Sequence, residues 1–333
     1  MSADQTVTGG HRRVRFGVLG CAEIARRKMM PALQQSSDAD LVAVASRTAE
    51  RAQAFATTFG CAAIAGYSAL LDRADIDAVY LPLPSGLHAQ WARAALSAGK
   101  HVLVEKPAVL RAADAAGLAD LAARRRLVLM ENFMFLHHGQ HEFVADLVTA
   151  GAIGRLQAFT CDFGIPPRPV GDIRNDPGLG GGALYDVGVY PLRAATFFLG
   201  SDLEIAGATR AVDRASAVDI AGAALLRNAA GVSAQLAWGF RHSYRAVYSL
   251  WGDAGRIELR RAFSCPADWR PIVEIERDDG VRYLTLPADD QFRNAVDCFI
   301  RAVRSHNAGY GAAVEIQRQA DLVEGVLRRG SAV

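Results

Sequence analysis

The chain has 333 residues, which is long for one hydrophobic core and favours two domains. Its 37 basic and 35 acidic residues give a formal net charge of +2, and no basic block predicts a nucleic-acid or membrane partner. Five scattered cysteines without a C-x-x-C pair argue against disulfides and structural zinc, and no apolar run is long enough to span a bilayer. These features predict a cytoplasmic protein without a bound metal.

Short apolar runs alternate with helical stretches through the first part of the chain. Buried strands are predicted at 14–20, 41–45, 78–81, 101–105 and 127–130, with helices at 24–35, 50–59, 88–98 and 112–124. Parallel strands need crossover helices between them. The alternation therefore predicts an α/β domain with a doubly wound parallel sheet over residues 12–131.

The pattern changes after residue 131. A helix at 141–150 leads into alternating strand-like runs at 156–163, 231–240 and 246–250, and helices at 291–305 and 314–329 close the chain. Alternating polar and apolar residues are typical of antiparallel sheets with one solvated face. Residues 132–333 are therefore predicted to form a second α/β domain with a mostly antiparallel sheet.

The first strand ends in a degenerate form of the glycine-rich turn that binds a dinucleotide. The turn comprises Gly20, Cys21, Ala22, Glu23 and Ile24, and alanines replace two of the usual glycines. Such a turn brings backbone N–H groups and a helix N-terminus against a pyrophosphate. An ordinary strand-to-helix turn is the alternative, but the surrounding strand, helix and strand favour cofactor binding.

The end of the second strand predicts which dinucleotide binds. Sites that prefer NAD place Asp or Glu there, whereas this chain has Ser46 and Arg47, with Arg51 one helical turn further on. A guanidinium pairs with the 2′-phosphate that distinguishes NADP from NAD, and a carboxylate repels it. The sequence therefore predicts NADP(H), with a solvated Arg47 as the alternative.

Candidate catalytic groups follow at the carboxyl ends of later strands, where open α/β sheets bind ligands. Glu105 and Lys106 end one strand, and the lysine can donate a proton to a carbonyl oxygen. A structural pairing of Lys106 with Glu105 is the alternative. His88 begins the helix after Pro84-Ser85-Gly86-Leu87 and is assigned to the cofactor wall.

In the second domain, a run of glycines precedes Asp186 and Tyr190, which are four residues apart and share one face of a helix. Tyr190 can protonate a developing alkoxide, and we expect the ammonium of Lys106 to lower the pKa of its phenol. A buried tyrosine with a satisfied hydroxyl is the alternative. The cluster His137, His138 and His141 lacks a committed thiolate or carboxylate, so it is interpreted as an exposed helix start rather than a metal site.

These motifs resemble the family of glucose-fructose oxidoreductase, inositol dehydrogenase and rhizopine-catabolism proteins over nearly the full chain. The resemblance rests on four motifs. They are the Gly20 turn, the stretch 84–88, residues 98–102 followed by Glu105-Lys106-Pro107, and the segment containing Asp186, Gly188 and Tyr190. It implies a Rossmann domain followed by an α/β domain with a large open sheet, often used for oligomerisation, and hence a homodimer or homotetramer. It also implies that Lys106 and Tyr190 flank the reacting carbon.

More narrowly, the stretches 131–135 and 174–177 are similar to the actinomycete sugar-nucleotide C-3 ketoreductases of deoxysugar biosynthesis. Many family members carry histidine where this chain has Tyr190, and a tyrosine there resembles the ketoreductase branch. The likeness implies that Arg174 and Asp186 contact the cofactor and that Tyr67 and Leu83 line its pocket. It also implies that the substrate is contacted by Lys28, Lys106, Tyr190 and Tyr244.

The activity implied by this likeness is reduction of dTDP-3,4-diketo-2,6-dideoxy-D-glucose at C3 by NADPH, with Lys106 or Tyr190 protonating the new oxyanion. One alternative is a dihydrodiol or sugar dehydrogenase that acts on a substrate without a nucleotide. Another is a non-catalytic, NADP-binding regulator, although the presence of both Lys106 and Tyr190 favours an enzyme.

Overall fold

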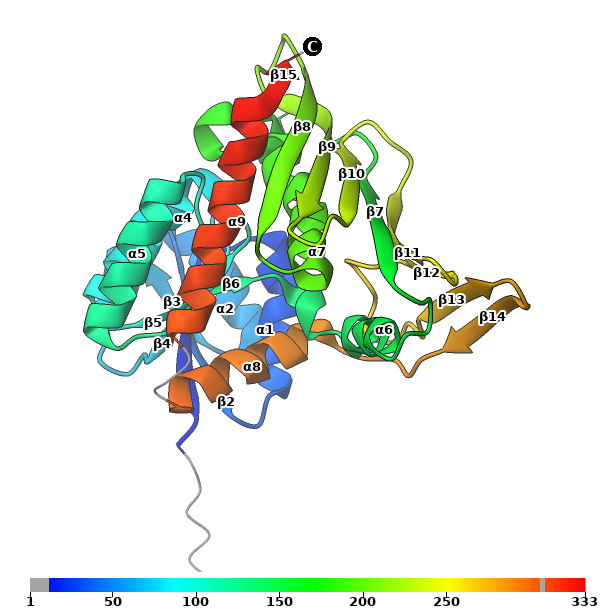
Figure 1. The fold of residues 1–333 in the computed structure, drawn as a ribbon. Helices are drawn as coiled ribbons and strands as arrows, with labels where there is room; N and C mark the ends of the chain where they lie inside the picture. Colours follow the sequence, from blue (N-terminus) through cyan, green and yellow to red (C-terminus); the bar gives the residue numbers. More distant parts are fainter. Residues whose placement is uncertain (1–11, 170, 306–308, 333) are drawn as a thin grey trace, which may run out of the picture.

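The computed structural model describes residues 12–169, 171–305 and 309–332. Two sheets organise it, a six-stranded sheet from the first part of the chain and a nine-stranded sheet from the second. Figure 1 shows the six-stranded sheet enclosed by helices and the nine-stranded sheet standing beside it. The predicted fold class, a doubly wound parallel sheet followed by a mostly antiparallel one, is confirmed.

All neighbouring strands of the first sheet pair in parallel, in the order β3-β2-β1-β4-β5-β6. The order reverses between β1 and β4, and ligands bind outside the carboxyl ends of strands at such a switch point. The strands are β1 (Val14–Leu19), β2 (Ala39–Ser46), β3 (Ala62–Ala65), β4 (Ala78–Leu81), β5 (His101–Glu105) and β6 (Leu129–Asn132).

Helical segments connect these strands and cover both faces of the sheet (Figure 1). They are η1 (Ala25–Met29), a π-helical stretch that continues into α1 (Met30–Gln35), then α2 (Ala49–Phe59), α3 (Tyr67–Leu71), η2 (Ser85–Leu87), α4 (His88–Ser97) and α5 (Ala112–Arg125). Strand β3 and helix α3 were not predicted. Both are only four or five residues long, and β3 consists mainly of alanine, so neither produces a periodic pattern.

The second sheet has the order β14-β13-β12-β11-β7-β10-β9-β8-β15, and only the pairs β7 with β10 and β8 with β15 are parallel. Its strands are β7 (Leu156–Gly164), β8 (Leu203–Val212), β9 (Asp219–Asn228), β10 (Ser233–Gly239), β11 (Arg245–Gly252), β12 (Arg256–Arg260), β13 (Ile272–Arg277), β14 (Gly280–Thr285) and β15 (Gly330–Ala332). Short helical segments precede and follow β7, namely η3 (Met134–His137), α6 (Gly139–Thr149), η4 (Ile173–Asn175), η5 (Pro177–Leu179), η6 (Leu184–Gly188) and α7 (Val189–Leu199).

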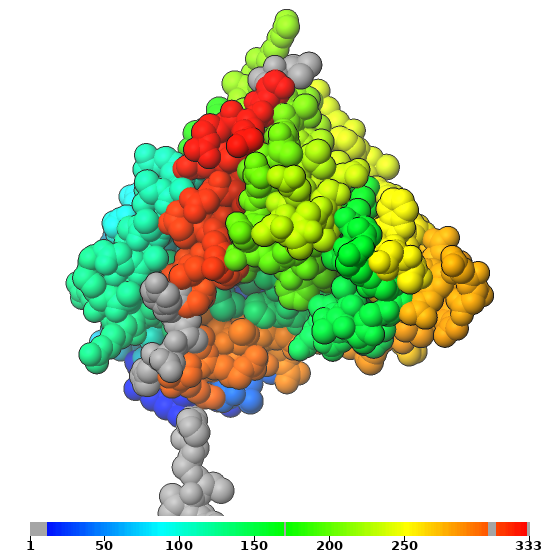
Figure 2. Space-filling model, in the orientation of Figure 1, coloured from blue at the N-terminus to red at the C-terminus, as the bar shows by residue number. Residues whose placement is uncertain are grey.

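The last two helices return to the first domain. Helix α8 (Gln291–Ser305) places Phe299 5.7 Å from the ring of Phe16 on β1, and Asp297 accepts a 2.7 Å hydrogen bond from Ser36. Helix α9 (Gly309–Arg329) fills the seam between the two domains, as the space-filling view shows (Figure 2). The two domains therefore share a packed interface. None of the described helices has the length and apolar character needed to cross a lipid bilayer.

Candidate active site

The glycine turn lies where the sequence placed it, between β1 and the first helix. Gly20 has a φ of 122°, and a Cβ atom there would lie 2.8 Å from Cδ2 of Leu83. The predicted pocket residue Leu83 therefore packs directly on the turn. Ala22 and Ile24 are partly exposed beyond Gly20, and Glu23 forms a 2.7 Å surface ion pair with Arg26.

The residues predicted to bind the adenosine end gather beside this turn. Ser46 is buried at the end of β2, and Arg47 is exposed and makes no hydrogen bond or ion pair within the described residues. Arg51 donates a 2.9 Å hydrogen bond from Nη2 to the carbonyl of Cys21, so it braces the turn. Burial raises the pKa of the Tyr67 phenol, and the charge of Arg47 acts in the opposite direction.

Lys106, Asp186 and Arg174 form a charged chain across the two domains. The ammonium of Lys106 donates to the backbone carbonyl and to Oδ1 of Asp186, both at 2.8 Å, while Nε of Arg174 donates to Oδ2 at 2.6 Å. Burial acts to raise the pKa of Asp186, but the charges and hydrogen bonds of Lys106 and Arg174 prevail and hold that pKa well below its usual range. Asp186 is thus a carboxylate that fixes the position of Lys106.

The alternative pairing of Lys106 with Glu105 is not what the structure shows. Oε1 of Glu105 accepts 2.7 Å hydrogen bonds from the hydroxyl of Tyr80 and from Nδ2 of Asn132. Burial of this carboxyl raises its pKa. Glu105 points into the core, whereas Lys106 points toward the second domain.

Tyr190 lies beside Lys106, with the ammonium 5.1 Å from the ring centroid. Four phenylalanine rings enclose it, Phe133, Phe135, Phe163 and Phe263, at centroid distances of 5.6, 5.8, 5.1 and 5.3 Å. The expectation of a lowered phenol pKa is wrong. Burial, followed by the negative charge of Glu105, raises the pKa of Tyr190 well above its usual value.

His88 was predicted to form part of the cofactor wall, and the structure buries its side chain to 1% exposure. Its Nδ1 lies 2.8 Å from the carbonyl of Pro107, and its Nε2 lies 2.6 Å from the carbonyl of Leu83. The imidazole therefore joins the turn after β4 to the turn after β5. Burial lowers the pKa of this imidazole.

The two remaining substrate candidates have partners outside the Lys106 group. Nζ of Lys28 lies 5.7 Å from the ring of Phe292 on α8, and the hydroxyl of Tyr244 lies 2.7 Å from Oγ of Ser264. The structure thus brings together Lys106, Arg174, Asp186 and Tyr190. It places Lys28 and Tyr244 further out, and no direct contact joins either to that group in the described chain.

Sequence reasoning missed a second, partly buried carboxyl in this region. Oε1 of Glu131, on β6, accepts a 2.8 Å hydrogen bond from the backbone N–H of Ala108, which follows Lys106 and Pro107. Burial raises the pKa of Glu131 to about 7. The available signal was positional, because Glu131 and Asn132 are polar residues at the carboxyl end of a buried strand.

The interpretation of the histidine cluster as an exposed helix start is wrong for His138 and His141, which are 2% and 0% exposed. His141 contacts the carbonyl of Ala262 through Nε2 at 2.9 Å and the hydroxyl of Tyr248 through Nδ1 at 3.1 Å. Among the described residues, no group of three or more His, Cys, Asp or Glu side chains has an arrangement that holds a metal ion.

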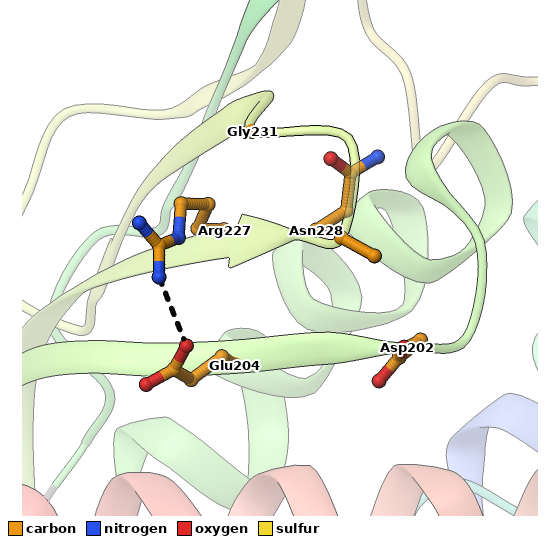
Figure 3. Close-up of a pocket in the computed structure, with 6 residues that line it drawn as sticks. Asp202, Glu204, Arg227, Asn228 and Gly231 are labelled. Atoms are coloured by element: carbon orange, nitrogen blue, oxygen red, sulfur yellow. Dashed lines mark hydrogen bonds and ion pairs between the residues drawn. The ribbon is translucent and has the colours of Figure 1, made fainter.

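One hollow of the surface, of about 390 Å³, lies away from all these residues, at the β8–β9 end of the second sheet (Figure 3). It is lined by Asp202, Glu204, Arg227 and Asn228, and an exposed 3.2 Å ion pair joins Glu204 to Arg227. This hollow contains none of the predicted site residues.

A doubly wound sheet with a glycine turn at its first strand, and an ammonium and a phenol at its carboxyl edge, defines a dinucleotide-binding oxidoreductase. Two family models place the chain within that class. The oxidoreductase family with an NAD-binding Rossmann fold, GFO/IDH/MocA, matches residues 14–133, and its C-terminal domain matches residues 141–258. The chain belongs to this family, as its motifs predicted.

Known proteins resemble the chain over almost its whole length. A dTDP-3,4-didehydro-2,6-dideoxy-alpha-D-glucose 3-reductase from Streptomyces violaceoruber is 51% identical over 98% of this chain and 97% of that protein. A D-xylose 1-dehydrogenase (NADP(+)) from Haloferax volcanii is 35% identical over 96% of this chain and 98% of that protein.

The fold is also similar to that of a solved 3-ketoreductase from Actinomadura kijaniata, in complex with NADP and TDP-benzene. The TM-score is 0.95 at 46% identity, over 97% of this chain and 99% of that one. Variants of that enzyme with one tyrosine or one lysine replaced have been solved as well. The two replaced residues are separated by the same number of positions as Lys106 and Tyr190.

Proposed function

We propose that the chain uses NADPH to reduce the C-3 ketone of a dTDP-linked 3,4-diketo-2,6-dideoxy sugar, a step of deoxysugar biosynthesis for a natural product. The observation that carries this proposal is the ammonium of Lys106, held by Asp186 beside the ring of Tyr190. The similarity to 3-ketoreductases over the whole chain supports the substrate class.

The residues at the carboxyl edge of the first sheet fit NADP. Gly20 leaves room over Leu83 for the pyrophosphate to approach the backbone, and Arg47 offers an exposed guanidinium to the 2′-phosphate. The proposed binding surface is completed by Cys21, Ala22, Glu23, Ile24, Ser46, Arg51 and Tyr67, with Arg174 and Asp186 from the second domain. Glu105 was also predicted to bind the cofactor, but its carboxyl points into the core. When bound, the nicotinamide supplies the hydride to C3.

Lys106 is the proposed donor to the ketone oxygen. An ammonium has three N–H groups, and two of those on Lys106 bond to Asp186. The third is left to stabilise and protonate the oxygen at C3 as negative charge develops there. The raised pKa of Tyr190 keeps its phenol protonated. Its hydroxyl, which donates to Sδ of Met134 at 3.7 Å in this structure, is the second candidate donor to the ketone oxygen.

Replacement of each donor tests these roles. We expect Lys106→Ala to lower kcat about 10²- to 10⁴-fold, and Tyr190→Phe to lower it about tenfold or more. Tyr248→Phe is the matched control, because it removes a buried hydroxyl that bonds to His141 and should leave kcat nearly unchanged. If steady-state kinetics show normal turnover in both Lys106→Ala and Tyr190→Phe, the assignment is wrong.

The substrate class has a separate test, because the 35% identical D-xylose dehydrogenase represents the alternative of a sugar without a nucleotide. Binding of dTDP to the folded state alone must raise the melting temperature, with about 2.7 kcal/mol of stabilisation at 100 times Kd. No shift with millimolar dTDP supports a dihydrodiol or sugar dehydrogenase. NADPH binding without oxidation by any ketosugar in a broad panel supports the regulator.

We also propose that the chain forms a homodimer or homotetramer through the outer face of the second sheet, which we define by Leu225, Trp251, Ile272, Val281 and Tyr283. These side chains are 45–64% exposed. The register places Trp251, Arg256, Glu276 and Val281 in one row across β11 to β14. Arg256 forms ion pairs with Glu274 and Glu276 between these exposed apolar side chains. Large exposed apolar side chains on one sheet face favour burial against a second copy.

From the five free thiols we infer a reducing, cytoplasmic compartment.

A further inference from the structure

The helix that carries Asp186 and Tyr190 begins without a capping side chain of its own. It starts as η6 and continues into α7, after a glycine run that ends in Gly182 and Ala183. The first N–H groups of a helix have no partner inside it, and a Ser, Thr, Asp or Asn just before the helix commonly accepts from one of them. No such residue stands there in this chain, and Leu184, the first residue of η6, is fully buried. The start of this helix therefore needs an acceptor from another part of the fold.

Asp219, the first residue of β9, supplies that acceptor. Its Oδ2 accepts a 2.8 Å hydrogen bond from the backbone N–H of Leu184, and the residue is only 7% exposed. The other carboxyl oxygen, Oδ1, lies against Gly182, where a Cβ atom would come within 2.5 Å of it. Gly182 also has a φ of 121°, which favours glycine. The carboxyl of Asp219 thus holds the helix start by one hydrogen bond and one close approach.

Two backbone hydrogen bonds of Gly182 connect this helix start to the active site. The carbonyl of Gly182 accepts from the N–H of Asp186 at 3.1 Å, and the N–H of Gly182 donates to the carbonyl of Arg174 at 2.9 Å. The side chains of Arg174 and Asp186 bond to each other, and Asp186 also holds the ammonium of Lys106. Tyr190 lies one helical turn after Asp186. A displacement of Gly182 therefore displaces the groups that fix Lys106.

We propose that Asp219 is a positioning residue, which fixes the start of η6 and thereby the place of Lys106 and Tyr190 relative to the substrate ketone. It acts through Gly182 and Leu184 and is not itself a catalytic residue. This inference rests on the proposed function, because the groups that it positions are those named for the ketone reduction. A misplacement of about 1 Å can cost about 100-fold in rate. The hydrogen bond to Leu184 can therefore affect turnover strongly in a protein that stays folded.

Removal of the acceptor, followed by its restoration, tests this role. We expect Asp219→Ala to lower kcat about tenfold or more, while NADPH affinity stays within about threefold, because the first domain binds the adenosine end. Asp219→Asn keeps a side-chain oxygen for the N–H of Leu184, so its kcat should return to within about threefold of wild type. Asp213→Ala is the matched control. Its carboxyl accepts from Ser216 and Arg241 in the connection between β8 and β9, and its loss should leave kcat unchanged.

A double-variant comparison separates positioning from general support of the fold. If Asp219 acts through Asp186, adding Asp219→Ala to Asp186→Ala should lower kcat by less than about a further twofold. The same loss in both backgrounds, or wild-type kcat in a folded Asp219→Ala, overturns the inference. If Asp219→Ala does not fold, Gly182→Ala tests the same contact, because its Cβ displaces Oδ1 of Asp219. It must then lower kcat in the wild-type background and not in Asp186→Ala.

Hydrogen exchange gives a readout that does not require turnover. The amides of residues 184–190 should exchange about tenfold faster in Asp219→Ala than in wild type, and Asp213→Ala should leave them unchanged. Unchanged exchange at these amides in Asp219→Ala overturns this inference alone. A wild-type protein that reduces no dTDP-linked diketo sugar overturns the proposed function, and exchange at residues 184–190 still decides whether Asp219 holds the helix start.

Discussion

Among single residues, Arg47 is the one that we propose sets the preference for NADPH over NADH. It is exposed at the end of β2, and no carboxylate stands there to accept the ribose hydroxyls. We expect Arg47→Ala to weaken NADPH about tenfold or more and to change NADH affinity little, because only NADPH carries the 2′-phosphate. Fluorescence titration measures both constants. Arg13→Ala, just before the amino end of the same sheet, serves as the control, and equal losses for both cofactors would count against the contact.

Glu131 makes stability depend on pH. Its folded pKa of about 7 exceeds the unfolded value of about 4.3, so the folded state holds a proton that the unfolded chain releases. The stability from this group is fully present below about pH 4.3 and is lost as pH rises through 7. We therefore expect Glu131→Gln, which keeps an acceptor for Ala108, to raise the melting temperature at pH 8 and to leave it unchanged at pH 4.

Differential scanning calorimetry at the two pH values measures this difference. Glu142→Gln changes an exposed glutamate on α6 and should shift neither melting temperature. If Glu131→Gln shifts the melting temperature equally at pH 4 and pH 8, then packing around Glu131, and not its ionisation, determines its effect on stability.

At the scale of an element, the turn from β1 into the first helix combines a strained backbone with a close contact. Ala in place of Gly20 must adopt a φ of 122° and place its Cβ against Leu83. We expect Gly20→Ala to cost about 1–3 kcal/mol of stability and to weaken NADPH binding. Gly60→Ala is the matched control. It has a φ of 65° at the end of α2 with open space around it, so it should lose stability but keep NADPH affinity.

Helices and strands differ in how well their bounds could be predicted from the sequence pattern. Strand β1 and helix α8 were predicted within one residue of their bounds, because one is a compact apolar run and the other has strong helical periodicity. Strands β13 and β14 were missed. Many of their side chains face solvent, and charged residues interrupt the apolar pattern that would mark a strand.

At the scale of the whole molecule, the outer face of the second sheet predicts self-association. Trp251 is 63% exposed on β11, so a charge there disrupts an apolar contact without entering the core. We expect Trp251→Glu to shift the protein toward monomer in light scattering coupled to gel filtration. Arg124→Glu on α5 should leave the mass unchanged. A wild-type monomer at all concentrations would contradict this interface.

The amino-acid sequence alone predicted the parallel sheet and the position of the glycine turn. It also showed that Ser46 and Arg47, and no acidic residue, stand at the end of β2, and it supplied the candidates Lys106, Asp186 and Tyr190. Each of these features depends on residues that are close together in the chain, so hydrophobic periodicity and motif spacing are enough to predict it. Tertiary structure decided that Lys106 pairs with Asp186 and not with Glu105, and that phenylalanine rings bury Tyr190. It also decided that His141 lies against the carbonyl of Ala262. These contacts join residues far apart in the chain, and pKa shifts depend on the burial and charges that such contacts create.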